Sequence, residues 1–168
     1  GHAFVEKITN MQKNNFLITQ NIDGLHQKSG IPRNKIIEIH GNAIEAACLE
    51  CGAKQNITDF HDAIKTKKQL PRCTVCNGTV KVATISFGQP MNEEDMEKAS
   101  NIVEDSDLMI VMGSSLKVLP AGKLPNLAMQ SGSKLVILNR EKTRYDSIAD
   151  VVINDELQNI CSGLIQKL

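Results

Sequence analysis

The chain has 168 residues, of which 41% are hydrophobic, so it can bury a core the size of one domain with a small insert. Nineteen basic and nineteen acidic residues give a formal net charge of zero, which argues against nucleic acid or a membrane as a direct partner. Aromatic residues make up 3% of the chain, so aliphatic side chains must build the core.

Short apolar runs alternate with helical patterns along the chain. The first helical pattern falls within residues 1–11. The runs that follow are apolar throughout, which is typical of strands covered on both faces. The alternation predicts an α/β fold with a doubly wound parallel, Rossmann-like sheet. The expected strands are residues 16–19, 36–39, 108–112, 135–138 and 151–153.

Helix signals separate the later strands. Asn92 is expected to cap a helix over 93–104, and Pro120 precedes a helix that ends near Gly132. Asp155 is expected to cap the last helix. Cys161 belongs to the apolar pattern of that helix, so we expect it to pack in the core.

Two Cys-X-X-Cys pairs lie on either side of residues 52–72. Cys48, Cys51, Cys73 and Cys76 at this spacing predict a tetrahedral zinc site. Because all four ligands are thiolates, no position is open to water, and the expected role of zinc is structural. Two disulfides or four ordinary buried cysteines are the alternatives. No signal peptide or long apolar run indicates an oxidising compartment, so a cytoplasmic location is expected.

The cysteine pairs interrupt the alternation of strands and helices. We therefore predict an inserted zinc-binding module over residues 43–82, with one helix near 58–68. Residues 1–42 and 83–168 are predicted to form the Rossmann-like domain.

Polar segments follow four of the expected strands, at 19–24, 40–41, 113–115 and 139–141. Ligands of an open parallel sheet bind beyond the carboxyl ends of its strands, so these segments are expected to line one cleft. Amides and hydroxyls suit the ribose and carboxamide of a nucleotide cofactor. The backbone N–H groups of 113–115 suit a phosphate or ribose oxygen.

His40 stands at a strand end and is followed by a glycine. An imidazole at this position can act as a general base on a hydroxyl. The alternative is a histidine that is hydrogen-bonded for structural reasons. Asn21 and Asp23 have a similar alternative, because such side chains often bond their own backbone in turns.

A set of motifs stands in a definite order along the chain. They are Thr19-Gln-Asn-Ile-Asp-Gly-Leu-His26, Glu38-Ile-His-Gly41, the two cysteine pairs, Phe87-Gly88, Gly113-Ser-Ser-Leu-X-Val-X-Pro120 and Leu138-Asn139. In this order they strongly resemble the sirtuins, the NAD-dependent protein lysine deacylases. The resemblance implies that NAD and an acyl-lysine protein or peptide meet in a cleft between a Rossmann-like domain and a structural zinc module.

The resemblance also implies roles for individual residues. His40 would be the general base, with Asn21 and Asp23 beside it at the reacting centre. The residues implied in cofactor binding are Gln20, Asn21, Ile22, Asp23, Gly113, Ser114, Ser115, Asn139, Arg140 and Glu141. Those implied in substrate binding are Ile85, Phe87, Gly88, Gln89, Leu116 and Val118.

The implied reaction removes acyl groups, including acetyl, from protein lysines and releases nicotinamide and O-acyl-ADP-ribose. The acyl oxygen attacks the ribose as nicotinamide leaves, and His40 helps to deprotonate the ribose hydroxyl that captures the acyl group. Two other functions remain open: protein ADP-ribosyl transfer, and zinc-stabilised binding of acyl peptides without catalysis.

One part of the family pattern has no match in this sequence. Sirtuins open with a strand and a Gly-Ala-Gly-X-Ser loop that holds the NAD pyrophosphate. We therefore expect a Rossmann-like domain that lacks its N-terminal βα unit, binds NAD weakly and turns over slowly or not at all. Such a sheet would have an exposed edge, so self-association through that edge is expected. Gln89 stands where the family usually has an acidic residue, which implies an altered peptide preference.

Overall fold

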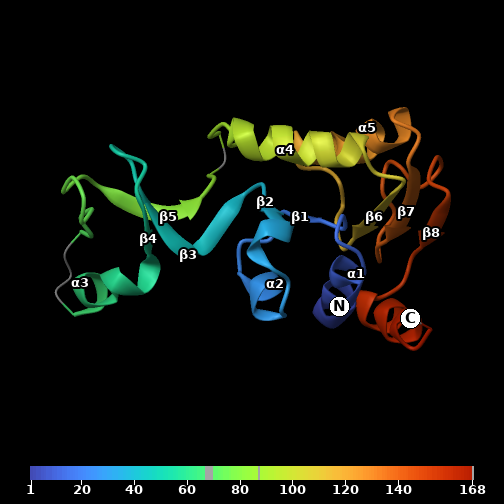
Figure 1. The fold of residues 1–168 in the computed structure, drawn as a ribbon, viewed down its shortest axis with the longest axis horizontal. Coiled ribbons are helices and arrows are strands. Elements are labelled where there is room, and N and C mark those ends of the chain that lie inside the picture. Colours follow the sequence, from blue (N-terminus) through green and yellow to red (C-terminus); the bar gives the residue numbers. More distant parts are fainter. Residues whose placement is uncertain (67–69, 87, 168) are drawn as a thin grey trace.

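The structure, a computed structural model, describes residues 1–66, 70–86 and 88–167 and contains two parallel sheets and one antiparallel sheet (Figure 1). In the first parallel sheet β1 (Leu17–Thr19) pairs with β2 (Ile36–Glu38). In the second, β7 (Lys134–Leu138) lies between β6 (Leu108–Met112) and β8 (Val151–Ile153). These strands confirm the predicted parallel α/β fold.

The antiparallel sheet lies at the opposite end of the molecule from the chain termini (Figure 1). Its central strand, β3 (Gly41–Cys48), pairs with β4 (Lys54–Asn56) and β5 (Val80–Thr84). The register of β3 against β5 is irregular between Gly41 and Ala46. This sheet carries the four clustered cysteines at its outer end.

Helices cover the parallel strands, and α4 (Glu93–Glu104) begins where the sequence indicates. Asn92 Oδ1 accepts a hydrogen bond from the N–H of Asp95 at 3.0 Å, which caps the helix as predicted. Among the described residues no helix has the length and apolar content to cross a membrane. The helices are α1 (His2–Met11), α2 (Leu25–Lys28), α3 (His61–Lys65), α4 (Glu93–Glu104), α5 (Leu124–Gln130) and α6 (Leu157–Ile165), and the 3₁₀ turns are Arg33–Lys35, Ile57–Phe60 and Ala121–Lys123.

Two helix predictions need correction. The helix expected near 58–68 is a 3₁₀ turn followed by α3, and Lys67 and Lys68 lie outside the described residues. Asp155 does not cap α6, whose N-cap residue is Glu156. The reason is that the Asp155 carboxylate accepts the N–H of its neighbour Glu156 at 2.6 Å, so the helix begins one residue later.

The helices form two layers around the parallel strands. On one side α4 and α5 bury Ile37 and Ile39, and Ile18 and Met109 pack against the same cluster. This layer therefore contacts both parallel sheets, as α4 shows in Figure 1. On the other side α1 and α6 pack together, and Cys161 is buried in their cluster, as predicted.

Candidate functional site

The residues just beyond β1 and β6 meet at one edge of the molecule. Ser114 Oγ donates a hydrogen bond to the side-chain carbonyl oxygen of Gln20, Oε1, at 3.1 Å. These residues are far apart in the sequence and follow strands of different sheets. The contact therefore brings the carboxyl ends of both parallel sheets together, where a ligand of an α/β fold binds.

His40 lies at the same edge, directly after β2 and residue Ile39. Its Nδ1 is 3.2 Å from the backbone carbonyl oxygen of Gln20. A carbonyl oxygen only accepts hydrogen bonds, so Nδ1 must carry the proton in this contact. In the neutral ring Nε2 is then unprotonated and can accept a proton. The contact thus orients the ring in the form that a general base requires.

The turn after His40 depends on the absence of a side chain at Gly41. Gly41 has a φ of +69°, and a Cβ built there would lie 2.0 Å from the carbonyl oxygen of Ala83. The backbone of β5 therefore runs directly against this turn. Ile85, the residue just beyond β5, donates its N–H to the carbonyl oxygen of His40 at 3.0 Å, which places its backbone beside that of His40.

The backbone of the loop after β1 is hydrogen-bonded to the start of β3, while the side chains of this loop are exposed. The carbonyl oxygen of Ile22 accepts the N–H of Ala43 at 2.7 Å. Asp23 Oδ1 accepts the N–H of Leu25 at 2.9 Å, which is the turn-forming role considered above. The side chains of Asn21, Ile22 and Asp23 are exposed, so they remain accessible to a ligand.

The polar residues beyond β7 differ in their burial. Asn139 is buried, and its amide donates to the carbonyl oxygen of Glu141 at 2.6 Å. Arg140 and Glu141 are exposed, and Arg140 forms an ion pair with Glu156 at 3.1 Å. Beyond β6, Ser115 is exposed. Asn139 therefore shapes the loop, while Arg140, Glu141 and Ser115 face solvent.

The loop after β5 is stabilised by Gln89. Its side-chain oxygen accepts hydrogen bonds from the N–H of Ser86 at 2.9 Å and from Lys81 Nζ at 2.7 Å. Gly88 is exposed. Phe87, which was predicted to contact the substrate, lies outside the described residues.

The two substrate residues predicted after β6 have different environments. Val118 is exposed. Leu116 is buried in the core with Val111 and Leu135, and its N–H donates to Ser114 Oγ at 3.3 Å. The side chain of Leu116 therefore supports the loop from below and is not part of its surface.

The four cysteines of the two pairs form one cluster. Their sulfur atoms all lie within 4.8 Å of one another, and none of the four forms a disulfide. Cys48 and Cys76 are 3.5 Å apart, and Cys51 and Cys73 are 3.7 Å apart. A tetrahedral zinc with Zn–S bonds of about 2.3 Å separates its sulfurs by about 3.8 Å. The cluster therefore has the dimensions of a zinc site with four cysteine ligands.

The surroundings of the sulfurs affect their ionisation unequally. The N–H groups of Cys76 and Val75 lower the pKa of Cys73 to about 6, so it is a thiolate at neutral pH. The N–H of Cys51 lowers the pKa of Cys48, but burial and the contacts with Cys76 and Glu50 raise it to about 12. Four thiolates this close repel one another, so a cation is needed to hold all of them ionised.

One polar cluster beside His40 was not predicted from the sequence. Asn42 is buried and contacts two carboxylates, those of Glu38 and Glu45. An open pocket of about 420 Å³ lies against it and is also lined by Gly41 and Ile85. The feature of the sequence that could have indicated this cluster is the position of Asn42, two residues after His40 and at the start of the antiparallel sheet.

The parallel strands, the imidazole at their ends and the inserted cysteine cluster define a Rossmann-like protein with four cysteines placed so that they could hold a metal ion. The family model described as "Sir2 family" matches residues 1–120. The chain belongs to the Sir2 family, the sirtuins.

Relatives and solved structures agree with this assignment. The chain is 41% identical to an NAD-dependent protein deacetylase of Rhodopseudomonas palustris and 44% identical to NAD-dependent protein deacetylase 1 of Bradyrhizobium diazoefficiens. Both matches cover 94% of this chain, but only 62% and 61% of the relatives' own lengths. A structure described as Sir2 bound to acetylated peptide superimposes with a TM-score of 0.88 at 32% identity, over 99% of this chain and 68% of the other.

Proposed function

We propose that the protein removes acyl groups, including acetyl, from lysine side chains of proteins in an NAD-dependent reaction that releases nicotinamide and O-acyl-ADP-ribose. The observation that carries this proposal is the orientation of His40 by the backbone carbonyl of Gln20, at the edge where the two parallel sheets end. Similar proteins named NAD-dependent protein deacetylases support it.

The exposed groups at this edge suit the cofactor. Amide and carboxylate side chains in the loop 20–23 match a carboxamide and ribose hydroxyls, so Gln20, Asn21, Ile22 and Asp23 would hold the nicotinamide riboside. Residues 113–115 and 139–141 would hold the rest of NAD. Bound NAD supplies the ribose hydroxyl that accepts the acyl group. His40 Nε2 would take the proton of that hydroxyl, because Nδ1 is engaged with Gln20.

The acyl-lysine would enter beside Ile85, which the backbone of His40 holds in place. Acylation removes the charge of the lysine, so an apolar lining desolvates it at low cost. The peptide would add as an extended strand between Gly88-Gln89 and Leu116-Val118, with Phe87 completing the tunnel.

A structural zinc ion held by Cys48, Cys51, Cys73 and Cys76 is also part of the proposal. The sulfur separations support it, and a cytoplasmic location is proposed with it. The zinc-binding module would comprise residues 43–82, and the Rossmann-like domain would comprise 1–42 and 83–168.

Self-association through the free edge of β6 completes the proposal. Within the described parts of the chain β6 pairs only with β7, and Leu108 at its start is 50% exposed. Light scattering behind a sizing column tests this: a mass that rises with concentration supports it, and a constant monomer mass contradicts it.

The reaction is tested by incubating the protein with NAD and an acetyl-lysine peptide. Nicotinamide release and the loss of one acetyl group from the peptide are measured together. His40→Ala should lower turnover by about 10² to 10⁴, the contribution of a general base. His61→Ala is the matched control, because His61 is exposed on α3, away from the strand ends.

Other outcomes select other functions. Wild-type turnover in His40→Ala would remove His40 from its role. A peptide that gains the mass of ADP-ribose would identify a protein ADP-ribosyltransferase. Peptide binding that persists without NAD and without turnover would identify a non-catalytic binding module.

A further inference from the structure

We propose that Asn42 is a positioning residue for His40, because its side-chain amide clamps the turn that carries the imidazole. This inference rests on the proposed role of His40 as the base. Asn42 lines the same open pocket as Ile85. The hydrogen bonds of its side chain nevertheless all go to the chain on either side of His40 and Gly41, so it acts through that turn.

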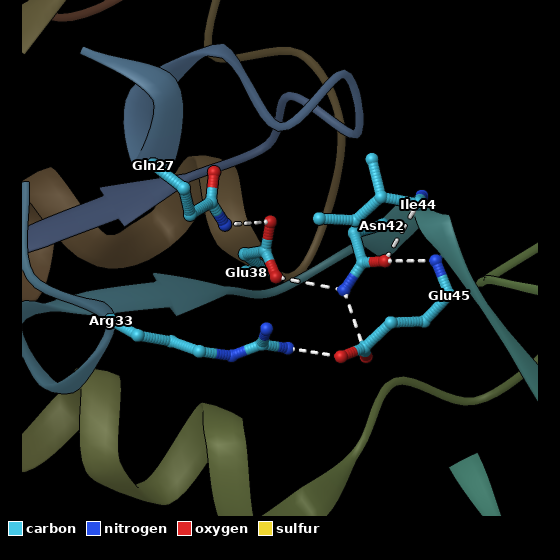
Figure 2. Close-up of polar contacts among 6 residues, drawn as sticks. All are labelled: Gln27, Arg33, Glu38, Asn42, Ile44 and Glu45. Carbon is cyan, nitrogen blue, oxygen red and sulfur yellow. Dashed lines mark hydrogen bonds and ion pairs between the residues drawn. The ribbon is translucent and has the colours of Figure 1, made fainter. Parts of the chain in front are cut away.

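The amide of Asn42 makes every hydrogen bond that it can make. Its Nδ2 donates to Glu38 Oε2 at 2.9 Å and to Glu45 Oε2 at 3.2 Å (Figure 2). Its Oδ1 accepts the N–H of Ile44 at 3.2 Å and that of Glu45 at 2.9 Å. Two donors and two acceptor positions are thus all used, in a side chain that is only 3% exposed. A buried and fully bonded group has little freedom to move.

The two carboxylates lie on opposite sides of the turn. Glu38 ends β2 of the parallel sheet, two residues before His40, and Asn42 stands two residues after it. The bond between them closes residues 38–42 into a short loop with His40 at its centre. Glu45 belongs to β3 of the antiparallel sheet. The clamp therefore fixes the imidazole relative to both sheets at their junction.

The same network reaches the loop that is proposed to bind the cofactor. Gln27, on α2, donates its amide to Glu38 Oε1 at 2.6 Å. The helix α2 directly follows the loop 20–24. Each of the two carboxylates also has a partner for the oxygen that Asn42 does not contact. Gln27 bonds Glu38 Oε1, and Arg33 forms an ion pair with Glu45 Oε1. The imidazole turn and the cofactor loop are held by one set of contacts.

The charges in the network favour an amide at position 42. Burial raises the pKa of Glu45, but the hydrogen bonds from Asn42 and Arg33 outweigh it and hold that pKa below its ordinary value. An ionised carboxylate accepts hydrogen bonds and cannot donate them. Aspartate at position 42 has the shape of asparagine, but it would add a third acceptor where two donors are needed.

The clamp can be tested by exchanging the donor and the acceptor of the hydrogen bond between positions 38 and 42. Asn42→Asp removes the donors to both Glu38 and Glu45, and the exchange restores the first of them. The double variant Glu38→Gln with Asn42→Asp supplies the donor from the other side, because the new amide at position 38 can donate to the new carboxylate at position 42. The first readout is the ¹⁵N spectrum of the His40 ring, which reports which nitrogen carries the proton. The second is kcat and KM with NAD and an acetyl-lysine peptide.

We expect the wild type to show the Nδ1-protonated ring of His40. Asn42→Ala and Asn42→Asp should show a mixture of both protonated forms, with kcat lowered by about 10- to 100-fold, the effect of a small misplacement of a catalytic group. The exchanged pair should recover part of the wild-type spectrum and kcat, because the bond between positions 38 and 42 is restored while the bond to Glu45 is not. If Asn42→Ala does not fold, Asn42→Asp and the exchanged pair carry the test.

Two control variants separate positioning from general destabilisation. Asn10→Ala removes the same kind of contact, an amide donating to Glu6 at 2.8 Å on exposed α1. Asn92→Ala removes the cap of α4 and lowers stability without removing any hydrogen bond of Asn42. Both should leave the ¹⁵N spectrum of His40 unchanged.

The proposal fails if Asn42→Asp has the wild-type His40 spectrum, if a folded exchanged pair recovers no part of it, or if Asn92→Ala changes it equally. The spectrum also keeps the two proposals distinguishable. A wild type without deacylase activity whose His40 ring still responds to Asn42→Asp would overturn the proposed function and leave the clamp in place.

Discussion

The parallel sheets and the cysteine-bearing sheet are stabilised in different ways. The parallel sheets are packed between helices in aliphatic clusters, where Leu135 and Ile137 have no exposed surface. Among the described residues the cysteine-bearing sheet has one small cluster, and two of its five buried members, Cys48 and Cys73, belong to the proposed zinc site. A region with so little apolar burial depends on a cross-link that the larger region does not need.

Exposed apolar side chains on the cysteine-bearing sheet and its loops also indicate that this region buries little apolar surface. Leu70 and Val75 are 76% and 73% exposed, although both are apolar. We therefore expect changes at the sulfurs to affect this region alone, and changes in the aliphatic core to affect the parallel sheets.

The largest effect should come from Cys73→Ser. Structural zinc contributes about 10–16 kcal/mol to the folding of small zinc domains, so losing one of four ligands should release the metal and unfold residues 43–82. Metal analysis should fall from about one zinc per chain to near zero. Amide hydrogen exchange should rise in β3, β4 and β5 but not in β6 or β7. Cys161→Ser is the control and should keep its zinc; full metal content in Cys73→Ser would contradict the comparison.

Leu135→Ala tests the other region. Truncating a fully buried leucine costs about 2–5 kcal/mol of unfolding free energy, measured by urea denaturation. The zinc content should not change. Val75→Ala, on the exposed face of the module, should change stability by no more than about 0.5 kcal/mol. Equal losses from both variants would show that the two regions do not differ as described.

Asn92→Ala should have an intermediate effect on the layer that spans the parallel sheets. Removing the cap of α4 should cost about 1 kcal/mol. Asn101→Ala, on the exposed surface of the same helix, keeps the cap and is the control. A loss in the control as large as that in Asn92→Ala would mean that the cap is not the cause.

Asp150→Asn should have the smallest effect, and that effect should depend on pH. The hydrogen bonds from Lys134 and then from the N–H of Leu135 hold the pKa of Asp150 below its ordinary value. Their stabilisation is present above the pKa of an unfolded aspartate, about 3.9, and is lost as the pH falls through the lower pKa of the folded state.

The difference in unfolding free energy between wild type and Asp150→Asn should therefore shrink between about pH 6 and about pH 2. Glu97→Gln, exposed on α4, leaves the Lys134 contact intact and serves as the control. A difference that stays constant over this range would rule out the carboxylate as its source.

The sequence was most informative where local and global signals agree. Strands 108–112 and 151–153 and the helix over 93–104 were predicted with their observed bounds, because apolar runs and a capping asparagine determine them locally. The cysteine cluster was also predictable, since the spacing of each pair brings its sulfurs together. The meeting of Gln20, His40 and Ser114 followed from the geometry of parallel strands.

The clamp at Asn42 could not be predicted in the same way. Its contacts with Glu38 and Glu45 depend on how β2 leads into β3, and neither spacing nor propensity gives that angle. The buried side chain of Leu116 was missed for a similar reason, because its orientation depends on a left-handed backbone conformation, with φ of +57°. The start of α6 was misplaced by one residue because Asp155 bonds the N–H of its neighbour Glu156 and no side chain caps the helix.

The close passage of the Ala83 carbonyl past Gly41 restricts how this protein can diverge. Every residue other than glycine would push the two strands apart, so position 41 must remain glycine for as long as β5 keeps this path. A homologue with a larger residue after the histidine would need a different path for the neighbouring strand, whatever else it shares with this chain.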